Sequence, residues 1–487
     1  MRFKRAVLCV LFVVAAISAV SAQNSFPDKA LGSISPEEVY NFCKTLASPQ
    51  FAGRYTSHEG FVAAAKWVGS KFKEWGLKAY NPKEGYLQPY PCPYTLLDEA
   101  EMTLILPVNK GEDPKEISTQ DIKLETESEF MPFLFSDSGS GTAEIVFAGW
   151  GISAPELGYD DFANIDIKGK FVLLFRGSPG TDDPRLREWM SANSPYFLKK
   201  AQEKGALGIL YIYSKEPIAY TGKEFIKGFC PFLVSEKVAD MILQEKGTTF
   251  ARLKQDLLSF KKPISFPLGS KVRYRVKSRN FPDGMSYNVI GYVEGSDPRL
   301  KKECTLMLAH LDHAGPQLGR LFLGAHDNAS GSAVVMELAK AFSKLGRKPK
   351  RSVVFILFTA EEIELGSSYF VKHLPSQFEK VDAIFDYDMV GVGDHVGLRL
   401  DTLPENFKKM LWDADQSIKI VRETTGPQRA ARKEGEDIPN LYFASGGGHT
   451  RYEDYHRSTD TIYRINPEIM AAIARLSFLT VRAWTDR

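Results

Sequence analysis

The chain has 487 residues, of which 44% are hydrophobic and 25% are charged, so a disordered, fibrous or collagen-like chain is excluded. Its length allows two or three domains, since a domain has roughly 150 residues. The formal net charge is +2, but Arg2, Lys4 and Arg5 are the only charged residues among the first 22, and without that segment the charge is −1. A chain this close to neutral carries no electrostatic signal for nucleic-acid binding.

The N-terminus has the pattern of a secretory signal peptide. Basic residues precede an apolar run from Ala6 to Ile17, and Val20 and Ala22 place small side chains just before Gln23. The alternative is a membrane anchor, but this run is shorter than the roughly 18 residues that span a bilayer. We therefore expect residues 1–22 to be removed, leaving a secreted or periplasmic protein with no stable membrane span.

Two amphipathic helices are expected next, at Ser35–Leu46 and Glu59–Trp75. Ser35 and Glu38 have the spacing of a capping box at the start of the first helix. Four prolines between residues 82 and 93 then interrupt the helical pattern. We predict that residues 23–93 form the N-terminal part of a larger domain that continues after an insertion.

Residues 94–278 have a different character, with short apolar runs separated by turns. Strands are expected at Met102–Leu106, Ala143–Ala148, Lys170–Phe175 and Leu207–Tyr213, and helices at Phe197–Lys204 and Glu236–Glu245. We interpret this region as an inserted, smaller, β-rich α/β domain.

From residue 279 to the end, strands and helices alternate clearly. Strands are expected at Tyr287–Val293, Cys304–Ala309, Ser352–Phe358, Asp382–Asp386 and Leu441–Ala444, and helices at Ser330–Leu345, Leu365–Leu374 and Pro467–Trp484. The nearly all-apolar run SVVFILF at Ser352–Phe358 is typical of a central parallel strand buried on both faces. The pattern predicts an α/β fold with a mostly parallel sheet sandwiched by helices.

Four cysteines follow the predicted signal segment: Cys43, Cys92, Cys230 and Cys304. No CxxC pair occurs among them, which disfavours a structural zinc ribbon. An oxidising compartment would permit disulfides, and four cysteines allow three complete pairings. Cys304 lies in a predicted buried strand and is expected to be a free thiol of the core.

Polar side chains follow the predicted strands at the points where these strands end. The candidates are His310 and Asp312, then Glu361 and Glu362, then Asp388, and finally His456. In open α/β sheets, sites form outside the carboxyl ends of the strands, so these segments are expected to meet at one sheet edge. Taken singly, each residue has an ordinary explanation: His310 as a loop histidine, the paired glutamates as a solvated helix start, and Asp327 as a cap for a helix at Ser330.

The joint set indicates a metal site. Imidazole and carboxylate ligands suit Zn²⁺, and less often Mn²⁺ or Co²⁺. Two histidines with three or more carboxylates exceed the needs of one tetrahedral zinc ion, and they suit two ions that share a bridging carboxylate. Of two adjacent glutamates, one can bind a metal while the other acts as a base.

Five ordered segments resemble the co-catalytic di-zinc aminopeptidase and glutamate-carboxypeptidase-type family of peptidase clan MH. They are LAHLDH (Leu308–His313), GAHDNASG (Gly324–Gly331), FTAEEIELGS (Phe358–Ser367), FDYDMVG (Phe385–Gly391) and YHRSTDT (Tyr455–Thr461). The inserted region resembles a protease-associated (PA) domain through VFAGWGI (Val146–Ile152), IKGKFVLLFRG (Ile167–Gly177) and AQEKGALGIL (Ala201–Leu210). The resemblance implies a zinc-peptidase fold with an inserted PA-like domain.

The resemblance also implies roles for individual residues. Asp327 would bridge two zinc ions, one completed by His310 and Asp388 and the other by Glu362 and His456. Two neighbouring residues would act on the substrate: Glu361 as general base and Tyr455 as a hydrogen-bond donor to the oxyanion.

Three further residues are expected behind the ligands. Asp312 would fix the ring of His310, and His313 and His326 are expected in supporting positions.

One segment departs from the family. Many members carry a Ser-Asp-His sequence that lines the substrate pocket, whereas the corresponding stretch here, Gly426–Ile438, contains no histidine. Arg429, Arg432 or Lys433 could face an acidic group of the substrate there, but surface charges are the favoured explanation.

The function expected from this resemblance is that of a secreted zinc aminopeptidase acting on peptides with two Zn²⁺ per chain. A carboxypeptidase, dipeptidase or N-acyl amino-acid hydrolase on the same site is the first alternative. A catalytically inactive PA-containing binding protein is the second, although its signature would be the loss of metal ligands. The sequence leaves the oligomeric state open.

Overall fold

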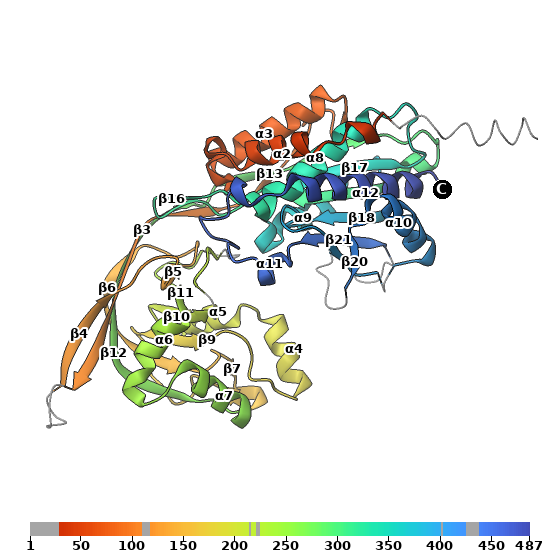
Figure 1. Ribbon diagram of the computed structural model, residues 1–487. Helices are drawn as coiled ribbons and strands as arrows, with labels where there is room; N and C mark the ends of the chain where they lie inside the picture. Colours follow the sequence, from red (N-terminus) through yellow and green to blue (C-terminus); the bar gives the residue numbers. More distant parts are fainter. Residues whose placement is uncertain (1–28, 110–116, 214–215, 221–224, 401–402, 425–437) are drawn as a thin grey trace, which may run out of the picture.

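The computed structural model describes residues 29–109, 117–213, 216–220, 225–400, 403–424 and 438–487. The predicted signal peptide, residues 1–22, lies outside these ranges. The described chain forms two bodies, each built on its own large β-sheet, and long strands run between them (Figure 1). We call the two sheets the main sheet and the second sheet.

The main sheet has nine strands in the order β1-β13-β17-β14-β18-β21-β19-β20, and β2 also pairs with β13. Its centre consists of four parallel strands: β17 (Ser352–Phe358), β14 (Glu303–His310), β18 (Lys380–Tyr387) and β21 (Asn440–Ser445). The flanking strands are β1 (Lys78–Ala79), β2 (Leu87–Pro91), β13 (Met285–Val293), β19 (Val396–Leu398) and β20 (Val421–Glu423). Antiparallel pairing joins these flanks to the parallel centre, and the α/β fold class is confirmed.

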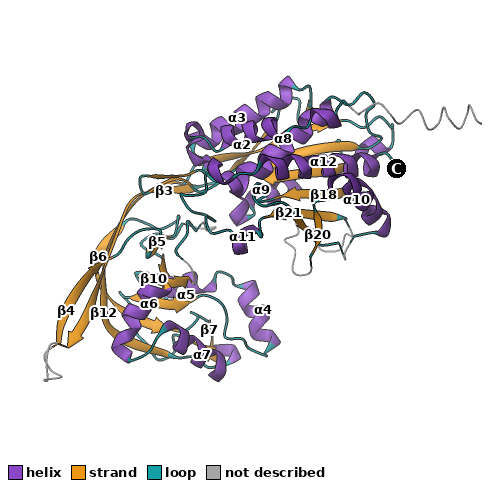
Figure 2. Cartoon of the chain, viewed as in Figure 1, coloured by secondary structure: helices purple, strands orange, loops and turns teal. Residues whose placement is uncertain are grey.

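Helices cover the main sheet unevenly (Figure 2). One face packs against α2 (Pro36–Leu46), α3 (Glu59–Glu74), α8 (Ser330–Ser343), α10 (Glu405–Ile418) and α12 (Pro467–Thr485), while α9 (Leu365–Lys372) lies on the other. Alternate residues of β17 serve the two faces: Val353 and Phe355 join the core under α8, whereas Val354 and Ile356 join the core under α9. Burial on both faces explains why this strand is apolar throughout.

Local signals set the helix ends. The side chain of Ser35 accepts a hydrogen bond from the Glu38 amide at the start of α2, so this end of the capping box is confirmed. Gly76 adopts φ +76° after α3, where the Leu77 amide donates to the Phe72 carbonyl and closes the last turn.

The second sheet has eight strands in the order β4-β3-β12-β6-β9-β10-β11-β5. These are β3 (Tyr94–Asn109), β4 (Ile117–Lys123), β5 (Phe130–Pro132), β6 (Gly139–Ala148), β9 (Phe171–Phe175), β10 (Gly208–Tyr213), β11 (Phe232–Ser235) and β12 (Ser265–Phe281). The accompanying helices are α4 (Pro184–Ala192), α5 (Tyr196–Glu203), α6 (Glu236–Leu243) and α7 (Phe250–Phe260). Short β7 (Ser153–Ala154) and β8 (Tyr159–Asp160) pair beside this sheet.

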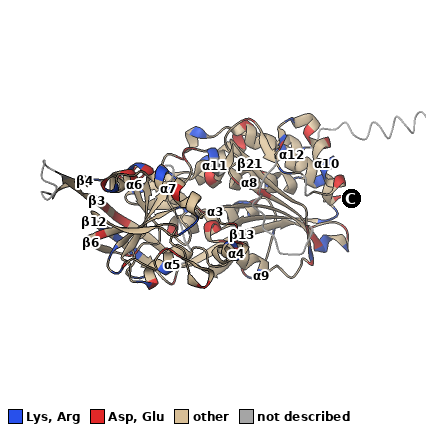
Figure 3. Ribbon diagram, turned by 90° about the horizontal axis from the view of Figure 1, so that it is seen from below, with Lys and Arg blue, Asp and Glu red and all other residues tan. Residues whose placement is uncertain are grey.

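Strand β3 is far longer than predicted, and β12 was not predicted. The expected strand Met102–Leu106 is only the middle of β3, and β12 alternates buried and exposed residues along most of its length. The exposed positions carry charges that pair across the strands, as in the ion pair between Arg279 and Asp98 (2.9 Å). Figure 3 shows basic and acidic residues mixed along this ribbon. In β12, residues 271–277 alternate charged and apolar side chains, which is typical of a half-exposed strand, whereas the prediction relied on apolar runs and so identified only the apolar segment of β3.

All four cysteines in the described chain are buried free thiols, as expected for Cys304, and none of them is paired. No helix within the described residues is long and apolar enough to cross a membrane.

Candidate metal centre

The carboxyl ends of the parallel strands bring the candidate ligands together. His310 is the last residue of β14, and Asp388 directly follows β18. Glu361 and Glu362 open a short helical turn, η7 (Glu361–Ile363), shortly after β17. His456 arrives on a loop after the short helix α11 (Gly448–Arg451).

The first half of the site surrounds His310. Its Nε2 lies 3.2 Å from Asp327 Oδ1 and 3.3 Å from Asp388 Oδ1. Its Nδ1 lies 3.2 Å from the backbone oxygen of Asp312, which fixes the ring with Nε2 turned towards the carboxylates. The Asp312 carboxylate accepts hydrogen bonds from the Thr56 hydroxyl (2.6 Å) and the Ala360 amide (3.0 Å).

The second half surrounds His456. Its Nε2 lies 3.1 Å from Asp327 Oδ2 and 2.9 Å from Glu362 Oε1. Its Nδ1 lies 2.9 Å from the backbone oxygen of Ala219, a residue of the inserted region. The ring of Tyr455 stacks on His456 at 3.9 Å, and its hydroxyl is 3.5 Å from Glu362 Oε1.

Asp327 lies between the two halves and presents one oxygen to each. Its own backbone is held by Asp460, whose carboxylate accepts hydrogen bonds from the amides of His326 (2.9 Å) and Asp327 (3.0 Å). The Asp327 side chain does not cap α8; the carboxamide of Asn328 accepts from the Gly331 amide instead. The structure therefore disfavours the cap interpretation of Asp327.

The buried carboxylates of the site require positive charge close to them. Burial alone would lower the pKa of His310, but hydrogen bonds to Asp312, Asp327 and Asp388 hold it well above its ordinary value. The pKa of His456 is likewise raised against the effect of burial, by Glu362 and Asp327. Without other cations, protons on these imidazoles balance the buried carboxylates, and metal ions can take that place.

Unsatisfied atoms at the centre fit the same interpretation. Two buried atoms, Asp327 Oδ2 and His313 Nε2, make no hydrogen bond. A ring nitrogen, His456 Nε2, nevertheless lies 3.1 Å from Asp327 Oδ2. A cavity of about 20 Å³ is lined by His310 and His456 together with His313 and Glu362. The residues thus offer mixed nitrogen and oxygen donors, which is the chemistry that zinc accepts.

His313 comes closer to this centre than its expected supporting position implied. Its Nδ1 lies 3.8 Å from Asp327 Oδ2, and His313, Asp327 and His456 offer donor atoms within 4.8 Å of one another. Burial lowers its pKa to about 3, so the ring is neutral with a lone pair available. Its position three residues after His310 was the only signal in the sequence, and a loop does not fix where such a residue points.

The remaining candidates have different surroundings. Glu361 is half-buried and lies near enough to His310 to favour its protonated form. His326 is buried against the ring of Tyr452 and accepts a hydrogen bond from the Gly391 amide. Arg429, Arg432 and Lys433 lie outside the described residues.

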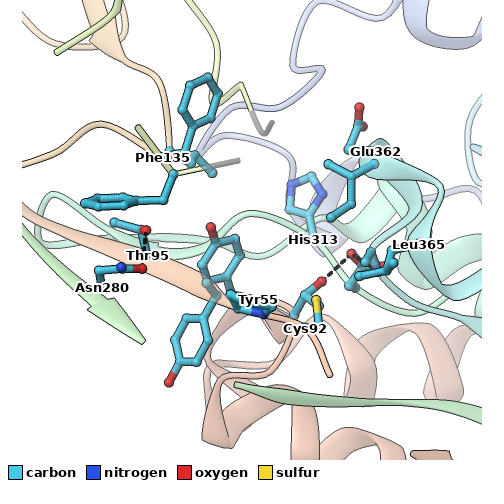
Figure 4. A pocket seen from close by; sticks show the side chains of 16 residues that line it. Tyr55, Cys92, Thr95, Phe135, Asn280, His313, Glu362 and Leu365 are labelled. Carbon is cyan, nitrogen blue, oxygen red and sulfur yellow. Dashed lines mark hydrogen bonds between the residues drawn. The ribbon is translucent and has the colours of Figure 1, made fainter. Parts of the chain in front are cut away.

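A larger pocket of about 120 Å³ opens beside the metal centre. In Figure 4, Phe135 and Thr95 lie on one side of it, and Glu362 and Leu365 lie on the other. Its lining is mostly apolar or aromatic and is drawn from both bodies. The residues are Tyr55, Thr56, Cys92, Pro93, Tyr94, Thr95, Leu134, Phe135, Phe225, Asn280, Asp312, His313, Ala360, Glu362, Ile363 and Leu365.

Comparisons with known proteins indicate a peptidase family. Residues 288–481 match Peptidase family M28. Aminopeptidase YwaD of Bacillus subtilis is 27% identical over 341 residues, which are 65% of this chain and 64% of that protein. Leupeptin-inactivating enzyme 1 of Streptomyces exfoliatus is 28% identical over 37% of this chain and 44% of its own length. The matches thus span less than two thirds of either relative.

Solved structures share the fold across nearly the whole chain. An aminopeptidase from Aneurinibacillus sp. strain AM-1 has a TM-score of 0.60 at 20% identity and covers 93% of this chain and 94% of its own. A peptidase M28 precursor from Shewanella amazonensis also has a TM-score of 0.60, at 19% identity, covering 94% of this chain and 95% of its own. Both bodies of the molecule therefore belong to a known architecture.

Proposed function

We propose that the chain is a zinc-dependent aminopeptidase that removes N-terminal residues from peptides, from the premise that residues 288–481 match Peptidase family M28. The observation that carries the proposal is Asp327, which presents one carboxylate oxygen to His310 and the other to His456. A carboxylate shared in this way is the feature that a site for two metal ions requires. BSAP of Bacillus subtilis, whose solved structure shares this fold, is a zinc aminopeptidase, which supports zinc as the metal.

We assign the ligands of two Zn²⁺ ions as two sets that share Asp327. One set adds His310 and Asp388, and the other adds His456 and Glu362. Bound zinc would polarise the scissile carbonyl and lower the pKa of water. Asp312 and Ala219 would hold the two imidazoles in the tautomer that binds metal through Nε2.

The chain's own groups would move the proton. Glu361 would accept a proton from the attacking water and pass it to the leaving amine. Tyr455 would donate its hydroxyl hydrogen to the carbonyl oxygen as negative charge develops there. The apolar pocket of about 120 Å³ would receive an uncharged side chain, because its aromatic walls suit hydrocarbon surface.

A carboxypeptidase, dipeptidase or N-acyl amino-acid hydrolase on the same site is the second candidate. Carboxypeptidase Q of Xenopus laevis is 24% identical over 39% of this chain, and this similarity supports a carboxypeptidase as the second candidate. The aminopeptidase is preferred because YwaD of Bacillus subtilis and the Aneurinibacillus enzyme, which match over 65% and 93% of this chain, are aminopeptidases. An inactive binding protein is disfavoured because the ligand set is complete.

We also propose that the enzyme acts outside the cytoplasm, secreted or in a periplasm. The support is the basic, apolar and small-residue pattern of residues 1–22. The molecular mass of the mature protein from its native source would test this directly, since loss of residues 1–22 leaves Gln23 as the first residue.

The decisive experiment replaces the proposed base. Glu361→Gln should lower kcat by about 10²–10⁴-fold, the usual size of a general-base effect, while about two zinc ions per chain remain bound. Glu364→Gln, an exposed neighbour in the same segment, is the matched control and should keep its activity. Activity of Glu361→Gln within about threefold of wild type would contradict the assignment of Glu361.

A substrate panel separates the candidate activities. Zinc-loaded protein should hydrolyse aminoacyl substrates with a free amine, and it should leave N-acylated and C-terminal substrates largely intact. Preferential cleavage of N-blocked substrates would instead establish the second candidate.

A further inference from the structure

The loop that carries His456 is anchored from both bodies. Asp460 holds its far end to the main body, whereas His456 and the two residues after it contact the inserted region. His456 Nδ1 lies 2.9 Å from the carbonyl oxygen of Ala219, and the Ala219 amide donates to the carbonyl oxygen of His456 at 3.0 Å. The two residues therefore exchange hydrogen bonds in both directions. His456 has φ +54°, a left-handed conformation that a non-glycine residue seldom adopts without support from its surroundings.

The next two residues of the loop are held by the same region. Arg457 donates to the carbonyl oxygen of Glu127 (2.8 Å) and forms an ion pair with Glu216. Ser458 donates its hydroxyl (2.8 Å) and its amide (3.3 Å) to the Glu127 carboxylate. Glu127 is only 7% exposed, and its other oxygen accepts from Arg320 at 3.0 Å.

Glu127 thus acts as a clamp between the bodies. One carboxylate of the inserted region binds Ser458 and Arg320, which lie on two different segments of the main body. A buried carboxylate with several hydrogen bonds holds its partners more firmly than an exposed ion pair does. We call Ala219, Glu216 and Glu127 the interdomain clamp.

From these contacts we propose that the interdomain clamp positions His456 and so sets the zinc affinity of one metal position. Docking of the inserted region and occupancy of that position by zinc are then mutually dependent. The carbonyl of Ala219 accepts the Nδ1 hydrogen and leaves the Nε2 lone pair facing Asp327 and Glu362. By thermodynamic reciprocity, an ion bound at His456 also holds the inserted region in place. The inference rests on the proposed function only in requiring that zinc binds at this centre.

The test compares two glutamates of one turn. Glu127→Gln removes the charge of the Glu127 side chain while keeping the shape of that side chain. Glu129→Gln is the control, because Glu129 pairs with Lys237 inside the inserted region (2.7 Å). Zinc binding is measured by competition with a chromophoric chelator, which resolves two successive binding steps.

In Glu127→Gln, one of the two zinc-binding steps should weaken by about 10–100-fold, the usual effect of losing a residue that orients a ligand. The other step should stay within about threefold, and Glu129→Gln should match wild type in both. Arg457→Met is the second variant, to be used if Glu127→Gln does not fold. It should weaken the same single zinc-binding step.

The reciprocal effect has its own measurement. Hydrogen exchange at residues 216–220 should slow when zinc is added to wild type, and this protection should shrink in Glu127→Gln. Two zinc steps of unchanged affinity in Glu127→Gln, or an equal loss in both steps, would overturn the clamp while leaving the proposed function intact. Failure of wild type to bind zinc at all would overturn the proposed function, and the clamp with it.

Discussion

His310 and His456 are two buried imidazoles with almost opposite means of support. His310 ends a central strand, and Asp312, two residues further along the chain, holds its Nδ1. His456 lies on an irregular loop, and the backbone of Ala219, 237 residues away in the sequence, holds its Nδ1. Both rings nevertheless present Nε2 to the same aspartate, Asp327.

Two equally buried side chains can therefore be held in position by different parts of the structure. His310 inherits its position from the register of β14 with its neighbours, so any event that preserves the sheet preserves it. His456 inherits its position from the docking of two bodies. The first half of the site should therefore withstand changes that disable the second.

The largest effect is expected where the two halves meet. Asp327→Asn removes the charge that both halves share, so both metal positions should lose affinity together, and activity should fall by at least as much as on loss of the general base, about 10²–10⁴-fold. Zinc content by elemental analysis and kcat/KM on an aminoacyl substrate would check this. Retention of two tightly bound zinc ions would contradict the assignment, because Asp327 would then not be shared by the two metal positions.

A selective loss is expected from Asp312→Asn. This change keeps the backbone oxygen that contacts His310 Nδ1 but removes the carboxylate charge beside it, since Asp312 Oδ1 lies 3.8 Å from the same nitrogen. We expect one zinc step to weaken by about 10–100-fold while the step at His456 is unchanged. Chelator competition on this variant and on Glu127→Gln should yield opposite patterns. If both variants weakened the same step, the two histidines would not belong to separate halves.

A smaller effect is expected from Phe135→Ala. Phe135 brings part of the inserted region to the pocket beside the centre. Losing its ring should raise KM for large apolar N-terminal residues by about tenfold, since hydrophobic contacts in pockets have effects of roughly this size. Zinc affinity should not change. A fall in zinc affinity would show that Phe135 supports the clamp rather than the substrate.

The smallest effect is expected from Tyr442→Phe. The Tyr442 hydroxyl donates to Asp388 Oδ2 at 2.6 Å, so its loss should weaken the zinc step of the His310 half only a few-fold, in keeping with the value of one charge-assisted hydrogen bond. Calorimetric titration with zinc would resolve the shift. An effect on the His456 half would contradict the independence of the two halves.

Much of the main body follows from its sequence. The apolar run of β17 has the predicted bounds, and the residues after the parallel strands meet at one edge because parallel strands share a direction. The clamp was not predictable. Ala219 acts through its backbone, which every residue possesses, and Glu127 looks like any surface glutamate until folding brings Ser458 to it.

Strand β12 and most of β3 were also missed. The middle of β12 alternates charged side chains with apolar ones, and the charges of the two strands find partners only after the strands pair. His313 illustrates the same limit at the site. Its neighbours in sequence give no sign that its ring lies near Asp327, since that depends on the path of a loop.

The ends of the inserted region lie side by side, with Tyr94 paired to Phe281 in register and their rings stacked at 4.5 Å. In genetic terms, such a region is a cassette: a host chain can gain or lose it at one point without shifting the register of its own sheet. The contact between Ala219 and His456 works against that freedom. A lineage that discarded the cassette would lose the partner of a proposed metal ligand, so selection on metal binding would act to retain it.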